Sequence, residues 1–412
     1  MPHSALEGLH VLDLTHYVAG PFATKLLADF GAEVIKLEKP PIGDPARNIG
    51  PFYKDDPAIE TSGLFLHLNT NKRSITLNLQ GESGKEIFRQ LIIWADVMVE
   101  NFSPTTLPSM GLTFDEISSW NPKLVMVSIS NFGQYGPYRD YKSEDIVAYG
   151  MGGPMLMTGI DEMEPSKLGL NVILYHSGLV AALAAMTAVT TVELGGHGHH
   201  IDVSIFETQV GTQDRRMSAM IGYQHTGDTF SRTPFNTFIA TGAKPCTDGF
   251  LSLSGGGMRL DRIAKMLGRP DLLEDPRFAS REAQRRPENA EAFDDELLLP
   301  WLQHRTSRQA WSDAQSFGVL SGPVLTIDQV LEDPHFKARE MWVELDHPIV
   351  GRLSYPGRPF IMGTTPSLLS KPVGSQNPLP APTLGEHNVS VLCELLGYSR
   401  SDLVRLRSCG VI

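Results

Sequence analysis

The chain has 412 residues, which is enough for one large core and a second, smaller domain. It contains 35 lysines and arginines and 47 aspartates and glutamates, and the resulting net charge of −12 argues against a general binder of nucleic acids or anionic membranes. Shares of 41% apolar and 20% charged residues are typical of an ordinary globular protein.

The sequence shows no clear signal for secretion, for a disulfide framework or for a membrane span. The amino-terminal sequence, MPHSALEGLHVLDLTH, lacks the basic segment and apolar core of a secretory signal. The three cysteines are too widely spaced for a disulfide framework or a zinc site. The most membrane-like segment, residues 178–192, is too short for a span and holds three threonines. These features predict a reduced cytoplasmic protein without membrane contact.

The first half of the chain alternates short apolar strands with helices. We predict strands at residues 11–15, 33–37, 74–79, 96–99, 124–130 and 201–206, and helices at residues 22–30, 83–95 and 177–193, with a turn at Gly20 and Pro21 before the first helix. A strand–helix–strand unit implies parallel strands. The alternation therefore predicts an open α/β sheet of Rossmann type, with ligands at the carboxyl ends of its strands. The fingerprint G-x-G-x-x-G is missing after the first strand, which argues against a dinucleotide enzyme.

The pattern changes after residue 206. A hairpin strand at residues 248–254 and helices at 260–267 and 282–303 predict a smaller α+β domain. A proline-rich connector at residues 364–384 and a final helix at 387–396 follow. We therefore expect the large domain to span residues 1–215 and 331–412, with the small domain at 216–330.

An ordered set of segments resembles the class III CoA-transferases, the CaiB/BaiF type. The segments are residues 8–40, 68–79, 95–102, 121–138, 165–207, 333–348 and 381–412. Each is short, but their order along nearly the whole chain is specific. The resemblance implies a Rossmann-like large domain, a smaller α+β domain, interlocked dimers and coenzyme A bound against the large domain, with no metal.

The resemblance also implies which residues contact CoA. By position these are Val18, Ala19, Lys39, Leu77, Asn78, Leu79, Gln80, Asn101, Phe102, Ser103 and Lys142. Lys39 and Lys142 fall where basic residues meet the nucleotide phosphates or a further part of the cofactor, and charged hydrogen bonds to phosphate are strong. Without the resemblance, both would be read as solvated surface lysines.

Four positions depart from the family pattern. Leu174 stands where the family has the aspartate that attacks the thioester, and Val18 stands where formyl-CoA transferase-like members have glutamine. Glu144 replaces a tyrosine or histidine, although Asp145 follows it. A glycine run is missing from residues 231–245, and the glycines at 255–257 come too late and indicate a turn. Nucleophilic catalysis needs an activated group, so Leu174 cannot supply it.

Several histidines and one serine are further candidates for site residues. His176 and Ser177 are predicted at a helix start, where Ser177 is more simply an N-cap. His16 in the first turn suits either ligand contact or packing. His197, His199 and His200 resemble a metal cluster, but a polar loop before a strand explains them and no partner ligand has suitable spacing.

Three functions remain open. The chain resembles the aspartate-lacking subunit of a heteromeric enzyme such as the succinyl-CoA:benzylsuccinate type, paired with an aspartate-bearing homologous subunit that moves CoA from an acyl-CoA to a small carboxylic acid. The alternatives are a homodimeric acyl-CoA enzyme that uses Asp145 or Glu144 as acid or base, and a non-catalytic CoA-binding or structural protein.

Overall fold

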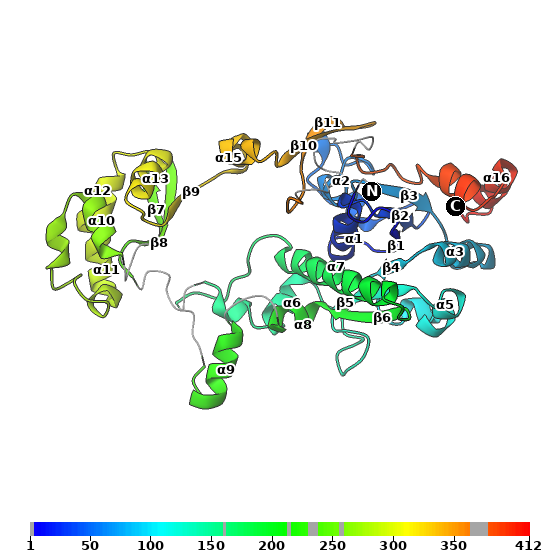
Figure 1. The fold of residues 1–412 in the computed structure, drawn as a ribbon, viewed down its shortest axis with the longest axis horizontal. Coiled ribbons are helices and arrows are strands. Elements are labelled where there is room, and N and C mark those ends of the chain that lie inside the picture. The colour runs from blue at the N-terminus through cyan, green and yellow to red at the C-terminus, as the bar shows by residue number, and fades with distance from the viewer. Residues whose placement is uncertain (1–3, 160–161, 212–215, 230–237, 255–258, 363–377) are drawn as a thin grey trace. The chain divides into compact units, whose positions relative to one another are not determined.

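The computed structural model describes residues 4–159, 162–211, 216–229, 238–254, 259–362 and 378–412 (Figure 1). Its contacts divide the chain into two compact units. Unit 1 comprises residues 1–155, 167–228 and 335–412, and unit 2 comprises residues 156–166 and 229–334. The domain limits suggested by the sequence stay a prediction.

A six-stranded sheet forms the centre of unit 1. Its strands pair in parallel in the order β3-β2-β1-β4-β5-β6. They are β1 (His10–Asp13), β2 (Glu33–Glu38), β3 (Lys72–Thr76), β4 (Val97–Glu100), β5 (Val125–Ser130) and β6 (His199–Ser204). The predicted Rossmann-type α/β fold is confirmed. The order reverses between β1 and β4, where open α/β sheets bind their ligands.

Side chains on both faces of the central strands are buried, which explains why β1, β4 and β5 are mostly apolar, whereas β6 at the edge begins with the exposed His199 and His200. In β5, Val125, Val127 and Ile129 face one apolar core with helices α1 (Ala19–Asp29) and α7 (Val172–Glu193). Met126 faces the other core with α3 (Glu82–Trp94) and α5 (Phe114–Trp120). Figure 1 shows α7 running alongside the sheet.

Two glycines allow close packing beside the loop that follows β1. A Cβ atom on Gly178 in α7 would lie 2.5 Å from the carbonyl oxygen of Ala19 in α1. A Cβ atom on Gly20 would lie 2.3 Å from the side chain of Thr15. The expected turn at Gly20 and Pro21 is wrong, because both residues belong to the first turn of α1. Proline is tolerated there, since the first amides of a helix have no partner within it.

Helix α7 begins earlier than expected. It starts at Val172 after Asn171, rather than at Ser177. The Ser177 hydroxyl donates to the carbonyl oxygen of Ile173 at 2.8 Å, so Ser177 is not an N-cap. Leu174 therefore lies in the first helical turn, and His176 lies beyond it.

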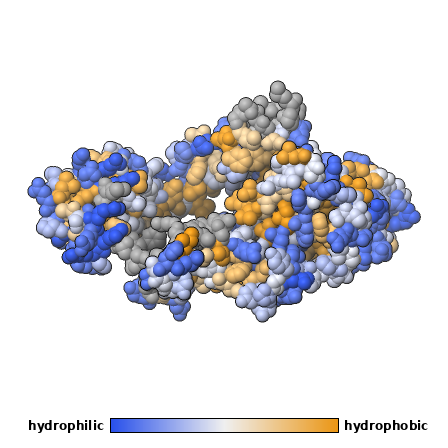
Figure 2. Space-filling model, turned by 60° about the horizontal axis from the view of Figure 1, so that its bottom comes forward, coloured by the Kyte–Doolittle hydropathy of each residue, from blue (hydrophilic) through white to orange (hydrophobic). Residues whose placement is uncertain are grey.

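The extra turn makes α7 22 residues long. Of the helices that the described residues form, it alone has the length and composition to cross a membrane, and 44% of its most apolar window is buried. The apolar segment expected at residues 178–192 is part of this longer helix, so its length alone does not argue against a span. Its outer side carries exposed apolar residues such as Leu179 and Leu183. Figure 2 shows that hydrophobic residues also occur on the molecular surface.

Shorter elements complete unit 1. They are the 3-10 helices η1 (Pro45–Asn48) and η2 (Tyr53–Asp55), the helices α2 (Gly63–Leu68), α4 (Thr106–Ser109), α6 (Asp145–Met151), α8 (Ile205–Gly211), α9 (Arg216–Thr226) and α16 (Arg400–Ser408), the antiparallel strands β10 (Trp342–His347) and β11 (Gly351–Pro356), and the π-helix η7 (Ser390–Leu395). The predicted strand ends at residues 79 and 206 are wrong by two or three residues, because β3 ends at Thr76 and β6 at Ser204.

Unit 2 has its own apolar core. Strands β7 (Thr241–Cys246), β8 (Gly249–Ser254) and β9 (Ser321–Val324) form an antiparallel sheet. Around it lie α10 (Leu260–Leu267), η4 (Pro270–Leu273), η5 (Ala283–Arg285), α11 (Pro287–Phe293), η6 (Asp294–Leu298), α12 (Leu299–Leu302), α13 (Ser307–Ser316) and α14 (Ile327–Glu332), while η3 (Met155–Met157) and α15 (Pro334–Ala338) span the unit limits. The single helix expected at 282–303 is broken, because Arg286 before Pro287 is extended.

Candidate functional site

A cavity of about 430 Å³ opens at the carboxyl end of the sheet in unit 1. It is lined by Tyr17, Val18 and Ala19 after β1, residues 101–105 after β4, the end of β5, residues 139–145, Leu174 of α7 and Ile205 of α8. The loops after β1 and β4 flank the point where the strand order reverses. This is the position in which an open α/β sheet binds its ligand.

The loop after β1 has a strained backbone that other residues hold in place. Tyr17 has a φ of 71°, a conformation that costs energy for a residue with a side chain. Its amide donates to Asp44 Oδ1 at 3.0 Å. The neighbouring His16 exchanges two hydrogen bonds with the Asn101 side chain, each 2.8 Å long. Because strain persists only where its surroundings enforce it, this loop is a built feature of the cavity.

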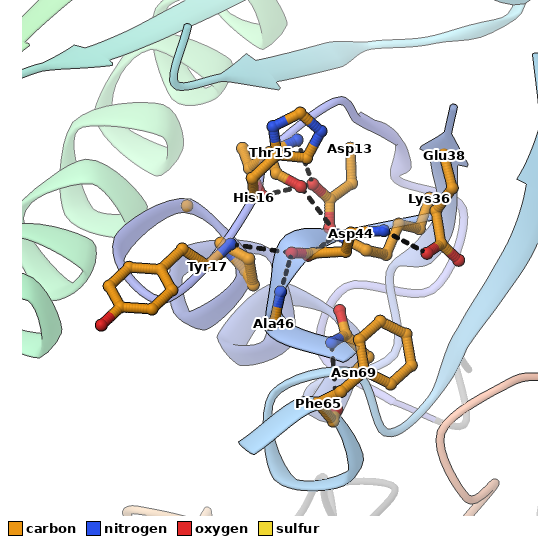
Figure 3. A network of polar contacts seen from close by, with 12 residues as sticks. Asp13, Thr15, His16, Tyr17, Lys36, Glu38, Asp44, Ala46, Phe65 and Asn69 are labelled. Carbon is orange, nitrogen blue, oxygen red and sulfur yellow. Dashed lines mark hydrogen bonds and ion pairs between the residues drawn. The ribbon is translucent and has the colours of Figure 1, made fainter. Parts of the chain in front are cut away.

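A buried ion pair supports the same loop (Figure 3). Lys36 Nζ lies 2.9 Å from Asp44 Oδ2, and both side chains are fully buried. Lys36 also donates to the carbonyl oxygen of Thr15 at 2.7 Å, and Asp44 Oδ1 accepts the amide of Ala46 at 2.8 Å. Burial alone would raise the pKa of Asp44, but the Lys36 ammonium and the backbone donors outweigh it and lower that pKa. Asp44 is therefore a permanent carboxylate.

The inner wall of the cavity is apolar. Val18, Ile129, Leu174 and Ile205 line it and are exposed by at most 8% of their surface. Leu174 belongs to the apolar core beneath the cavity. An aliphatic side chain cannot attack a thioester, so the cavity has no nucleophile at this position.

Three polar groups of the lining have an atom without a hydrogen-bond partner among the described residues. They are Ser130 Oγ, Arg139 Nε and Asp145 Oδ1. Asp145 Oδ2 forms an ion pair with Lys167 Nζ at 2.6 Å, whereas Arg139 Nε lies 3.7 Å from Asp140 Oδ1. The cavity thus joins an apolar inner wall to a polar outer lining, and an apolar surface beside convergent polar groups suits a small-molecule site.

Six of the eleven predicted CoA contacts lie together in this cavity: Val18, Ala19, Asn101, Phe102, Ser103 and Lys142. The other five do not line it. Lys39 is exposed after β2, and the side chains of Leu77 and Leu79 belong to an apolar core. Asn78 donates its backbone amide to Val411 at 2.8 Å. At residues 77–80, a ligand could therefore meet only the backbone, Asn78 or the exposed Gln80.

Three positions that the sequence predicts to depart from the family pattern, Val18, Glu144 and Leu174, also line this one cavity. The glycine run was expected within residues 231–245, and the structure describes only residues 238–245 of this range. The later glycines at residues 255–257 lie outside the described residues. Sequence reasoning missed Ser130, Arg139 and Ile205 as lining residues. The signal for Ser130 was its place at the carboxyl end of a predicted strand.

The histidines are separate from the inner wall. The ring of His16 packs against Phe102, with 5.2 Å between centroids, and burial lowers its pKa. His200 Nε2 lies 2.9 Å from Ser128 Oγ, and its ring stacks on Phe114. Among the described residues, no three His, Cys, Asp or Glu side chains gather in a way that could hold a metal.

Comparisons with known proteins agree over nearly the whole chain. CoA-transferase family III matches residues 6–388. Succinyl-CoA–D-citramalate CoA-transferase of Chloroflexus aurantiacus is 33% identical over 416 residues, covering 100% of this chain and 99% of that protein. Human succinyl-CoA:glutarate CoA-transferase is 30% identical over 415 residues, covering 99% and 90%. A CaiB/BaiF family protein from Brucella suis superimposes with a TM-score of 0.83 at 29% identity, covering 96% of this chain and 100% of that protein.

Proposed function

The chain belongs to CoA-transferase family III, and we propose that it is a subunit of an enzyme that moves CoA between an acyl-CoA and a carboxylic acid. In this proposal the chain binds CoA but does not form the covalent acyl intermediate, and a homologous, aspartate-bearing subunit performs the chemistry. The proposed pairing is that of the benzylsuccinate type, as the sequence analysis predicts. The three unpaired cysteines suit a reducing compartment such as the cytoplasm.

One observation carries the proposal, namely the burial of Leu174 in the cavity wall. The side chain is 8% exposed and packs in the core formed with Ile173 and Ile205. The position is therefore an apolar packing site in this chain. The names of the relatives, which are CoA-transferases, support CoA as the ligand. The six predicted contacts that line one cavity support this cavity as the place where CoA binds.

The subunit proposal can be tested with the protein from its source cell. Native mass spectrometry of the purified complex is expected to show a second chain of similar size. The chain produced alone is expected to lack transferase activity, and co-expression with an aspartate-bearing homologue is expected to yield it. Full activity of the chain alone would contradict the proposal.

Replacing Leu174 by aspartate is expected not to create a transferase. The carboxylate would enter an apolar core, so we expect a loss of about 2–4 kcal/mol in the free energy of unfolding, partly offset by the helix amino terminus. Urea unfolding and an assay of acyl-CoA with a panel of carboxylic acids would measure both effects. Leu174→Asn is the matched control, because asparagine has nearly the same shape as aspartate but no nucleophilic carboxylate. Turnover by Leu174→Asp alone would show that the other predicted departures, at Val18, Glu144 and the glycine run, matter little for catalysis.

Replacing Lys142 by alanine is expected to weaken CoA binding about three- to tenfold. The exposed ammonium lines the cavity, and an exposed pair with phosphate contributes about 1 kcal/mol. Calorimetry with CoA at low and high salt would measure the effect, which salt should reduce. Lys123→Ala is the control, because Lys123 is also exposed but does not line this cavity. Equal losses in both variants would indicate a general charge effect.

A second candidate function rests on Asp145. Its Oδ1 atom has no partner among the described residues and Asp145 lines the cavity, so a homodimeric acyl-CoA enzyme could use it as a base. Its Oδ2 atom forms an ion pair with Lys167 Nζ at 2.6 Å, which holds the side chain in place at the cavity. Hydroxylamine trapping distinguishes the two candidates, because an acyl anhydride is trapped and a general base is not. Activity of the isolated chain that Asp145→Asn abolishes would favour this second function.

A further inference from the structure

Ser130 differs from the other buried polar residues of the sheet. It is the last residue of β5, it is 6% exposed, and its hydroxyl has no hydrogen-bond partner among the described residues. Ser128, two residues earlier on the same strand, has its hydroxyl 2.9 Å from His200 Nε2. Because buried polar groups are almost always paired, an unpaired hydroxyl beside a cavity indicates a group that a ligand completes.

The surroundings of Ser130 define which part of a ligand it meets. Six lining residues are buried, namely Val18, Ala19, Ile129, Ser130, Leu174 and Ile205. Ser130 is the one polar side chain among them, and none of them is a cation. Lys142 and Glu144 of the lining are exposed.

This distribution orients an acyl-CoA. Phosphates are costly to bury and therefore stay near solvent and Lys142, while the acyl end enters the apolar part. A second carboxylate on the acyl group would find no cation among these six residues, because Arg139, whose Nε atom has no hydrogen-bond partner among the described residues, belongs to the outer lining with a side chain that is 38% exposed. The buried part thus suits an uncharged acyl chain with one hydrogen-bond acceptor.

We propose that the Ser130 hydroxyl donates a hydrogen bond to the carbonyl oxygen of an uncharged, apolar acyl group of an acyl-CoA, and so selects acyl-CoA over free CoA. The inference rests on the proposed CoA-binding function and names its ligand class. The proposed ligand differs from succinyl-CoA and glutarate, which the names of the relatives contain, because its acyl group has no second carboxylate.

Calorimetry with CoA, butyryl-CoA and succinyl-CoA tests the proposal. The wild-type protein, in its native assembly, should bind butyryl-CoA more tightly than CoA or succinyl-CoA. Ser130→Ala should weaken butyryl-CoA binding about three- to tenfold and leave CoA binding unchanged, as expected for the loss of one neutral hydrogen bond. The ligand-free variant should also resist urea slightly better, because an unpaired buried hydroxyl has been removed.

Ser128→Ala is the matched control. It removes a paired hydroxyl from the same strand, so it should lower resistance to urea and leave butyryl-CoA binding unchanged. Equal losses for CoA and butyryl-CoA in Ser130→Ala, tighter binding of succinyl-CoA by the wild type, or unchanged butyryl-CoA binding would each overturn the assignment of Ser130. Failure of the wild type to bind any of the three ligands would instead overturn the proposed function itself, together with this inference.

Discussion

Replacing Lys36 by methionine is expected to lower the free energy of unfolding by about 3–5 kcal/mol, the usual effect of leaving a buried charge without its partner. Lys36 Nζ lies 2.9 Å from Asp44 Oδ2, and neither side chain is exposed to solvent. Methionine has a similar length but leaves the Asp44 carboxylate without its counter-charge. It also removes the hydrogen bond to the carbonyl oxygen of Thr15, 2.7 Å long, beside the cavity. Urea unfolding followed by circular dichroism measures the loss.

Two further variants separate charge from packing. Arg89→Met removes a pair with Glu86 whose side chains are 41% and 48% exposed, and the free energy of unfolding should stay close to that of the wild type. The double variant Lys36→Met with Asp44→Asn removes the orphaned charge and keeps an oxygen that can accept the amides of Tyr17 and Ala46. It should recover part of the loss. A double variant no more stable than Lys36→Met would show that the unpaired charge is not the cause.

The sheet was predictable because its central strands β1, β4 and β5 are mostly apolar and the strands alternate with helices. The start of α7 was not predictable from the sequence. Asn171 caps the helix without a side-chain hydrogen bond, and the residues that follow, Val172, Ile173 and Leu174, are as apolar as those of a buried strand. Apolar runs of this length fit a strand or a buried helix equally well. The early start matters, because it places Leu174 on the helix, whereas a helix that began at residue 177 would leave Leu174 before it.

The cavity was predictable in part. Resemblance placed Val18, Asn101 and Lys142 near one ligand, and the structure brings them to one cavity. The residues that hold the loop after β1 in place beside this cavity were not predictable. Lys36 and Asp44 read in sequence as ordinary charged residues, and their pairing depends on the fold between β2 and the loop after β1. Ser130 reads as the polar end of a strand, and its lack of a partner appears only in three dimensions.

Replacing Glu100 by glutamine is expected to stabilise the protein at high pH. Glu100 ends β4, is 4% exposed, and accepts the amide of Phe102 at 2.8 Å. Burial raises its pKa from 4.5 to about 7, with a smaller effect in the same direction from Asp202. Between these two pH values the folded chain holds a proton that the unfolded chain has released, so stability falls as the pH rises through this window. The cost reaches about 3 kcal/mol above pH 7.

Glutamine keeps an oxygen for the Phe102 amide but carries no charge to bury. The variant should therefore exceed the wild type by less than about 1 kcal/mol at pH 5 and by up to about 3 kcal/mol at pH 8, measured by urea unfolding at each pH. Comparing the two proteins at each pH cancels the other titrating groups. Glu116→Gln, on the exposed side of α5, should show no such difference. If the gap between wild type and Glu100→Gln does not grow with pH, the Glu100 carboxyl is already ionised in the folded protein at pH 5, and burial does not control its proton.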